Sequence, residues 1–227
     1  MAKKEINTNQ IGLITLTNPT SPIAEQYRTI RTNLQFSSSM NKKIQTIVIT
    51  SAGPGEGKST TAANLAVVFA NSGSKVLLVG ADMRKPTLYK VFNLLNTAGL
   101  STILSTGQDL VSAVQKTLID NLSILTSGPK PPNPSELLNS QRMIQVLEEA
   151  RRQYDVIIFD MPPIVAVTDA QIMASKVDGT LLVAREKVTK KEALTKANQL
   201  LNLVNARVVG AVYNGAKQEN GQDYYYY

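Results

Sequence analysis

Residues 50–60 of this chain read TSAGPGEGKST, and they carry the clearest signal in the sequence. An apolar, β-rich run precedes them at 44–50, and a run with the spacing of an apolar helix follows at 59–71. A glycine-rich loop between a strand and a helix is the setting in which backbone N–H groups surround a phosphate. We therefore predict a phosphate-binding loop at this point of the chain.

The residue types of this loop suit a nucleotide. Its glycines let the backbone curl around a phosphate, Lys58 can reach the β- and γ-oxygens, and the Ser59 hydroxyl can bind Mg²⁺. Ala52 stands where the strict pattern has its first glycine, a replacement that the general motif tolerates. A chance glycine-rich turn is the alternative, but the flanking strand and helix favour a nucleotide site. The expected nucleotide-binding residues are Gly53, Pro54, Gly55, Glu56, Gly57, Lys58, Ser59 and Thr60.

The rest of the chain alternates between strand-like and helix-like runs. Strands are predicted at 44–50, 76–79, 122–125, 156–159, 179–184 and 207–213, and helices at 59–71, 141–152 and 190–204. Such alternation predicts an α/β fold, here a P-loop domain with a mainly parallel central sheet flanked by helices. Thr189 and Glu192 have the spacing of a capping box at the start of the last helix.

Two aspartates follow predicted strands and are candidates for holding a metal ion. Asp160 closes the strand at 156–159, as a Walker B carboxylate does, and Asp82 follows the strand at 76–79 by a few residues. Because parallel strands end at one edge of the sheet, we expect Asp82, Asp160 and Ser59 to bind Mg²⁺ together. Each aspartate could instead only cap a turn.

The composition excludes several kinds of chemistry. The 227 residues include no His, Cys or Trp, which rules out Ser-His-Asp and Cys-His nucleophiles and the usual zinc and iron–sulfur sites. The formal charge of +7 could favour nucleic acid, anionic lipid or phosphorylated ligands. Aromatic residues make up only 5% and do not alternate with basic ones, so we expect no nucleic-acid partner. Neither a signal peptide nor a membrane span is apparent, and we expect a soluble, cytoplasmic protein.

Two terminal segments stand apart from the predicted core. Ser21 and Pro22 have the positions of N-cap and N1 in a helix whose other side carries charged residues. The last segment, 217–227, is polar and ends in four tyrosines, which suggest a phosphorylation substrate. The apolar stripe of the first helix is Ile23, Tyr27, Ile30 and Leu34, its charged side is Glu25, Arg28 and Arg31, and the terminal cluster is Tyr224, Tyr225, Tyr226 and Tyr227.

Four motifs together resemble the bacterial tyrosine kinases, in particular the cytoplasmic kinase component of Gram-positive capsule and exopolysaccharide systems. They are the phosphate loop, DMRKPT at 82–87, GPKPPNPSELL at 128–138 and DMPP at 160–163. The resemblance implies a fold like that of partition and septum-site ATPases, with ATP and Mg²⁺ as cofactors. It also implies that protein tyrosines are the substrates, and that the cluster Tyr224–Tyr227 is phosphorylated by a neighbouring subunit.

The same resemblance implies an assembly. In the family the helix carrying Glu25, Arg28 and Arg31 closes a homo-oligomeric ring, typically an octamer, and a membrane adaptor's cytoplasmic tail activates the kinase. The protein would then be cytoplasmic and peripheral to the membrane. A simple Glu25–Arg28 pair on a solvated helix face is the alternative. The implied organisation is an N-terminal extension at 1–20, a kinase domain at 21–216 with an oligomerisation helix at 21–38, and a tail at 217–227.

The remaining site residues are assigned partly by this resemblance. Lys58, Asp82, Asp160 and Arg84 are the expected catalytic residues; Arg84 and the adjacent Lys85 follow Asp82 where a transferring phosphoryl group would lie. Asn214 is expected to bind adenine.

Gly80 departs from the family, which has Asp there to help activate the tyrosine hydroxyl, so we expect weakened activity. The alternatives are a partition-type ATPase, although Gly53 stands where that class has a signature Lys, and a nucleotide-binding, ring-forming scaffold with little catalysis.

Overall fold

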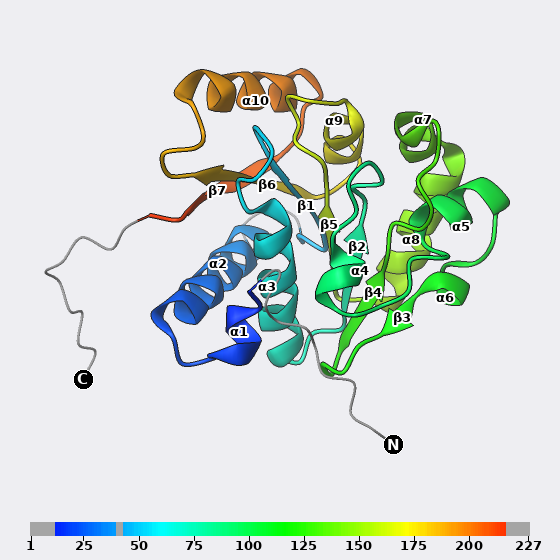
Figure 1. Ribbon diagram of the computed structural model, residues 1–227, viewed down its shortest axis with the longest axis horizontal. Coiled ribbons are helices and arrows are strands. Elements are labelled where there is room, and N and C mark those ends of the chain that lie inside the picture. Colours follow the sequence, from blue (N-terminus) through cyan, green and yellow to red (C-terminus); the bar gives the residue numbers. More distant parts are fainter. Residues whose placement is uncertain (1–11, 40–42, 217–227) are drawn as a thin grey trace, which may run out of the picture.

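The computed structural model describes residues 12–39 and 43–216, so the tyrosines at 224–227 lie outside the described residues. Within this part, seven strands form one sheet in the order β3-β4-β2-β5-β1-β6-β7 (Figure 1). Only the β3–β4 pair is antiparallel. The strands are β1 (Thr46–Ser51), β2 (Val76–Gly80), β3 (Gln115–Lys116), β4 (Leu122–Leu125), β5 (Val156–Asp160), β6 (Gly179–Arg185) and β7 (Val208–Asn214).

The strand order brings distant parts of the sequence to one edge of the sheet. β5 lies between β1 and β2, with Asp160 level with Ile49 on one side and with Gly80 on the other. Since all three strands run in the same direction, the loops that follow them leave from the same edge. The phosphate loop, the Asp82 loop and Asp160 are therefore neighbours.

Helices cover both faces of the sheet, as expected when parallel strands are buried on both sides (Figure 1). One buried cluster joins α1, α2, α3 and α4 to side chains such as Ile47 and Ile158. The other joins helices α5 to α10 to alternate side chains of the same strands, such as Val48 and Phe159. The helices are α1 (Ile14–Thr17), α2 (Pro22–Ser39), α3 (Lys58–Asn71), α4 (Leu88–Val91), α5 (Leu100–Thr106), α6 (Leu110–Ala113), α7 (Pro134–Asn139), α8 (Gln141–Gln153), α9 (Asp169–Ala174) and α10 (Lys191–Leu203).

The α/β fold and all six predicted strands are confirmed, with ends within two residues of those expected. The two-residue strand β3 and the short helices were not predicted. The capping box at Thr189 was wrong: Lys190 is the N-cap of α10, and the Thr189 hydroxyl instead accepts a hydrogen bond of 2.7 Å from the Arg185 N–H. The chain turns tightly after β6, and this turn uses the hydroxyl that would have capped the helix.

The helix α2 begins as predicted but packs differently. Ser21 accepts a hydrogen bond from the Ala24 N–H at 3.2 Å, which fits an N-cap. Tyr27 and Leu34 are buried, whereas Ile23 is 52% exposed and Ala24 is fully buried in its place. The small side chain lets the start of the helix approach its neighbours closely, so the buried stripe is rotated by one residue at this end.

Part of the expected N-terminal extension is folded. Leu13 is fully buried, and Asn64 of α3 accepts hydrogen bonds from the Thr15 N–H at 3.0 Å and from its hydroxyl at 2.9 Å. The described part of this segment is thus attached to the helix that follows the phosphate loop.

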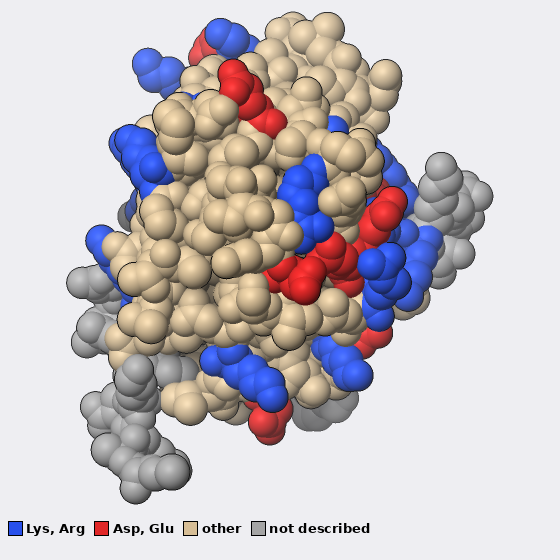
Figure 2. All heavy atoms as spheres, turned by 90° about the vertical axis from the view of Figure 1, so that its right-hand side faces the viewer, with Lys and Arg blue, Asp and Glu red and all other residues tan. Residues whose placement is uncertain are grey.

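Charges of both signs share the face that carries α5, α6 and α7. Figure 2 shows acidic and basic side chains close together there. The positive charge of the chain is therefore not concentrated on this face. Within α8, Arg142 and Glu149 form an ion pair of 2.8 Å. None of the helices in the described ranges is long and apolar enough to span a bilayer.

Candidate nucleotide site

The phosphate loop has the backbone geometry of a phosphate cradle. Gly55 and Gly57 have φ of 75° and 97°, in the left-handed region that favours glycine. A Cβ at Gly57 would also overlap the amide nitrogen of Asn214. Helix α3 starts at Lys58, so its N-terminal N–H groups face the space above the loop. These features together suit an anionic phosphate.

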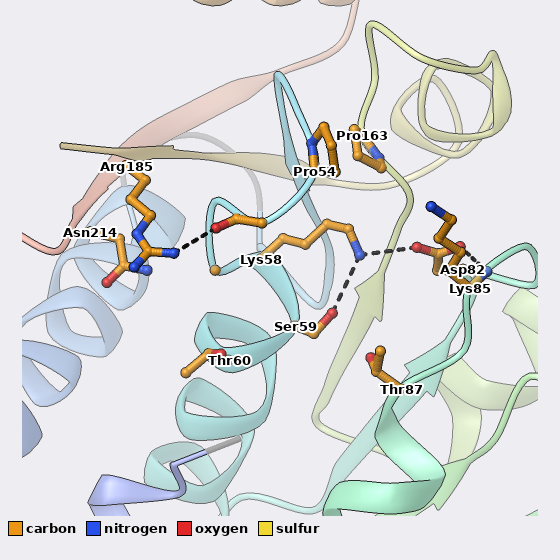
Figure 3. Close-up of a pocket in the computed structure, with 12 residues that line it drawn as sticks. Pro54, Lys58, Ser59, Thr60, Asp82, Lys85, Thr87, Pro163, Arg185 and Asn214 are labelled. Atoms are coloured by element: carbon orange, nitrogen blue, oxygen red, sulfur yellow. Dashed lines mark hydrogen bonds and ion pairs between the residues drawn. The ribbon is translucent and has the colours of Figure 1, made fainter. Parts of the chain in front are cut away.

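The loop forms one side of a pocket of about 460 Å³. Figure 3 shows the loop and the start of α3 on one side and the Asp82 loop on the other. The size is within the range of small-molecule sites. The pocket is lined by Pro54, Gly55, Gly57, Lys58, Ser59, Thr60, Asp82, Lys85, Thr87, Pro163, Arg185 and Asn214.

Lys58 lies at the centre of a cluster of oxygen atoms. Its ammonium nitrogen is 3.0 Å from an Asp82 carboxylate oxygen, 3.6 Å from Asp160 Oδ1 and 3.3 Å from the Ser59 hydroxyl. Burial alone would lower the pKa of Lys58, but the Asp160 and Asp82 carboxylates outweigh it and raise that pKa. Burial raises the pKa of Asp160, although Lys58 opposes the change. This cluster therefore requires a cation at its centre.

These residues fit a magnesium–nucleotide complex. Asp82, Asp160 and Ser59 converge on one positive group, and oxygen ligands of this kind are those that Mg²⁺ prefers. Asp160 Oδ1 is buried and has no hydrogen-bond partner among the described residues; its one charged neighbour there is the Lys58 ammonium at 3.6 Å, so its hydrogen-bonding capacity is unused, as a metal-binding oxygen requires. In this structure the Lys58 ammonium is the positive group between the two carboxylates.

Asn214 and Arg185 hold the outer side of the phosphate loop. The Asn214 amide donates to the Glu56 carbonyl at 3.1 Å, and the Arg185 guanidinium donates to the Gly55 carbonyl at 2.9 Å. Both residues line the pocket, at the ends of the neighbouring strands β7 and β6. Asn214 therefore lines the pocket with one amide N–H used by the loop, and its contact with adenine stays a prediction.

The structure does not bring Arg84 into the pocket. Its guanidinium forms two hydrogen bonds of 2.9 Å with the carboxylate of Asp169, which is fully buried, and a third of 3.1 Å with the Ser135 hydroxyl. The Asp169 hydrogen bond raises the pKa of Arg84. In this structure Arg84 thus forms an ion pair with Asp169 while Lys85 lines the pocket, and a contact of Arg84 with a transferring phosphoryl group stays a prediction.

Gly80 pairs with Asp160 across the neighbouring strands β2 and β5. It lines a small cavity of about 10 Å³ together with Asp82, Asp160, Thr87 and others. A Cβ on Gly80 would lie 3.3 Å from the Ser127 backbone nitrogen, so this neighbour would have to shift by a few tenths of an ångström. The next nearest atoms are the Leu125 carbonyl oxygen and Leu88 Cδ1, both at 3.7 Å.

The charged residues of α2 make contacts within one chain. Glu25 and Arg28 form an exposed ion pair of 2.7 Å, and Arg31 donates to the Val68 carbonyl of α3 at 3.4 Å. The Glu25–Arg28 pair is the contact expected of a solvated helix face. The contact between subunits of a ring stays a prediction.

Three pocket residues were missed at the level of sequence: Thr87, Pro163 and Arg185. Arg185 ends β6, Pro163 follows the end of β5, and Thr87 follows the Asp82 loop. Ligands in open α/β sheets bind outside the carboxyl ends of the strands, and this rule could have found Arg185 and Pro163.

Much of the chain is similar in sequence to known proteins. A family model described as an AAA domain matches residues 44–209. The tyrosine-protein kinase YwqD of Bacillus subtilis is 49% identical over 96% of this chain and 92% of its own length. The putative tyrosine-protein kinase CapB of Staphylococcus aureus is 39% identical over 100% of this chain and 98% of its own.

Solved structures extend the comparison. The kinase domain of the Escherichia coli tyrosine kinase ETK superposes with a TM-score of 0.89 at 34% identity, covering 99% of this chain and 87% of that one. The cell division ATPase MinD of Pyrococcus furiosus shares the fold, with a TM-score of 0.64 at 24% identity over 74% of this chain and 71% of that one. The predicted relation to the septum-site ATPase fold is thereby confirmed. With its AAA-type P-loop domain and near full-length similarity to these kinases, the chain belongs to the bacterial tyrosine-protein kinases.

Proposed function

We propose that this kinase uses ATP and Mg²⁺ to phosphorylate Tyr224–Tyr227 of a neighbouring copy, and that this reaction regulates capsule or exopolysaccharide synthesis. The observation that carries the proposal is the convergence of Lys58, Ser59, Asp82 and Asp160 at one pocket edge. The names of the relatives support the reaction type, and one of them is a putative tyrosine-protein kinase in a cps region. The tyrosine cluster supplies an acceptor.

Each residue has a defined part in this proposal. The N–H groups of the phosphate loop bind and orient the phosphates, and Lys58 leaves the two carboxylates to bind the β- and γ-oxygens. Asp82, Asp160 and Ser59 would hold Mg²⁺, which neutralises phosphate charge when bound. Phosphoryl transfer depends mainly on such positioning and charge neutralisation. The reaction therefore does not require a histidine or cysteine.

We expect a slow rate for this chain. Gly80 offers no carboxylate to take the proton from the tyrosine hydroxyl, and general-base assistance is typically worth about 10²–10⁴ in rate. Lys58, Asp82 and Asp160 retain the phosphate and metal functions. Weakened transfer, rather than none, is the expectation.

We further propose that the tail controls assembly. In this view the kinase forms a ring, an octamer in the form that we expect, through the α2 residues Glu25, Arg28 and Arg31. It is activated by a membrane adaptor's cytoplasmic tail, so that it works in the cytoplasm at the membrane.

Four phosphotyrosines would add roughly −6 to −8 charge, enough to offset the chain's +7. Unmodified tails would dock in neighbouring basic sites, and phosphorylated tails would leave them.

Incubation with ATP-Mg²⁺ labelled on its γ-phosphate tests the proposal against its rivals. Label on the tyrosine tail, lost in Lys58→Met, supports the kinase. Released phosphate without protein label indicates a partition-type ATPase. Bound, unreacted nucleotide indicates a ring-forming scaffold, and either of these last two results would contradict tail phosphorylation.

A further inference from the structure

Arg84 and Lys85 are consecutive cations with different surroundings. Arg84 is bound to the buried Asp169, a residue of α9, and to Ser135 of α7. Lys85 instead lines the nucleotide pocket. Figure 3 shows it beside Asp82, on the side of the pocket opposite the phosphate loop. The Arg84 ion pair thus fixes the loop so that the next residue faces the site.

Lys85 is anchored at its backbone and exposed at its side chain. Its backbone N–H donates to Asp82 Oδ1 at 2.9 Å, which attaches the start of the side chain to one of the candidate metal ligands. Among the described residues no carboxylate forms an ion pair with its ammonium group. A pocket cation without an anionic partner is available for an anionic ligand.

The other pocket cations have fixed tasks. Lys58 faces two carboxylates, and the Arg185 guanidinium holds the Gly55 carbonyl on the outer side of the phosphate loop. Phosphates cradled by that loop and α3 would extend toward the Asp82 side of the pocket, where Lys85 lies. The group that lies farthest along this direction is the terminal phosphate, which ATP has and ADP lacks.

We propose that Lys85 binds the terminal phosphate of ATP and so enables the pocket to distinguish ATP from ADP. This inference rests on the proposed nucleotide function and assigns a specificity residue within it. After transfer the product ADP lacks the group that Lys85 binds. Because Lys85 contacts only the terminal phosphate, it strengthens the binding of ATP and not that of ADP. The exchange of ADP for ATP is thereby favoured.

The test is a binding comparison in full-length protein. Isothermal titration measures the affinity of the parent chain and Lys85→Gln for ADP-Mg²⁺ and for a non-hydrolysable ATP analogue with Mg²⁺. We expect Lys85→Gln to lose about 10-fold in affinity for the analogue, the scale of one hydrogen bond to a charged group, and to bind ADP as the parent does. Lys85→Arg should retain most of the affinity for the analogue.

Lys90→Gln is the matched control, because Lys90 is an exposed cation of α4 outside the pocket. It removes the same charge and should leave both affinities unchanged. Equal losses for ADP and the analogue in Lys85→Gln, or no loss for either, would overturn the assignment of Lys85 while leaving the kinase proposal standing. Conversely, a parent chain that shows the Lys85-dependent preference but labels no tyrosine would support Lys85 and contradict the kinase proposal.

Discussion

Replacing Arg84 by Met should destabilise the fold, because it removes the cation from a carboxylate that is fully buried. Asp169 receives two hydrogen bonds of 2.9 Å from Arg84 and one of 2.7 Å from the Ser135 hydroxyl. Breaking a buried ion pair typically costs about 3–5 kcal/mol. The Arg84 side chain is 36% exposed, so water screens part of the interaction, and we expect a loss of about 2–3 kcal/mol.

Urea denaturation and thermal melting measure this loss. A change of this size corresponds to a fall in melting temperature of about 4–12 °C for a chain of this length. Asp169→Asn is the matched control, since it keeps the shape of the side chain but removes the charge that needs Arg84. Asp169→Asn should lower the free energy of unfolding less in the Arg84→Met background than in the parent chain. The difference between the two losses, the coupling energy, should be about 2 kcal/mol.

The kinase assay of the same variants decides between a structural and a catalytic Arg84. An Arg84→Met protein that melts like the parent, yet transfers phosphate about 100-fold more slowly, would refute the reasoning. Its guanidinium would then act on the reacting groups and not on Asp169.

The other predictions concern the base, the phosphate loop, the fold and the tail. Gly80→Asp should raise the rate of autophosphorylation by about 10²-fold or more, with Gly80→Ala as the steric control; equal rates in all three proteins would remove the reason for placing a base here. Lys58→Met should abolish the thermal protection that ATP-Mg²⁺ gives the parent chain, and protection that persists would contradict its role in phosphate binding. Asp178 is partly buried, which by itself raises its pKa, but hydrogen bonds from Arg151 and from backbone N–H groups lower that pKa overall. Its carboxylate therefore stabilises the fold above about pH 3.9 and loses this effect as pH falls through its lower folded pKa. The free energy of unfolding that Asp178→Asn loses, measured in urea, should therefore be present at pH 7 and shrink below about pH 4. A loss that stays constant across this range would contradict the argument. Light scattering should show a lower mass after ATP-Mg²⁺ treatment, and an unchanged mass would argue against the tail switch.

The central sheet and its site could be predicted because their signals are local. Asp160 is the last residue of an apolar strand, and the geometry of parallel sheets places such a residue near the phosphate loop. The glycines at 55 and 57 likewise require no knowledge of distant contacts. The sequence pattern alone therefore predicts that Lys58, Asp82 and Asp160 lie close together.

What could not be predicted depends on contacts between distant residues. Arg84 and Lys85 are adjacent cations with nothing local to separate them, and the difference arises from Asp169, 85 residues further along the chain. Ile23 matches an apolar stripe as well as Ala24 does, but the close packing of α2 selects the smaller side chain. The strand β3 has only two residues, which is too short for a periodic pattern.

The most direct test of the account separates the donor site from the acceptor tail. A kinase with Tyr224–Tyr227 all replaced by Phe is mixed with a Lys58→Met chain that keeps its tyrosines, and both are analysed by peptide mass spectrometry after incubation with ATP-Mg²⁺. The account predicts phosphate on the tyrosine tail of the Lys58→Met chain and none when that chain is incubated alone. A Lys58→Met chain without phosphate in the mixture, while the parent labels its own tail, would contradict transfer between subunits; a parent tail that also stays unlabelled would contradict the account as a whole.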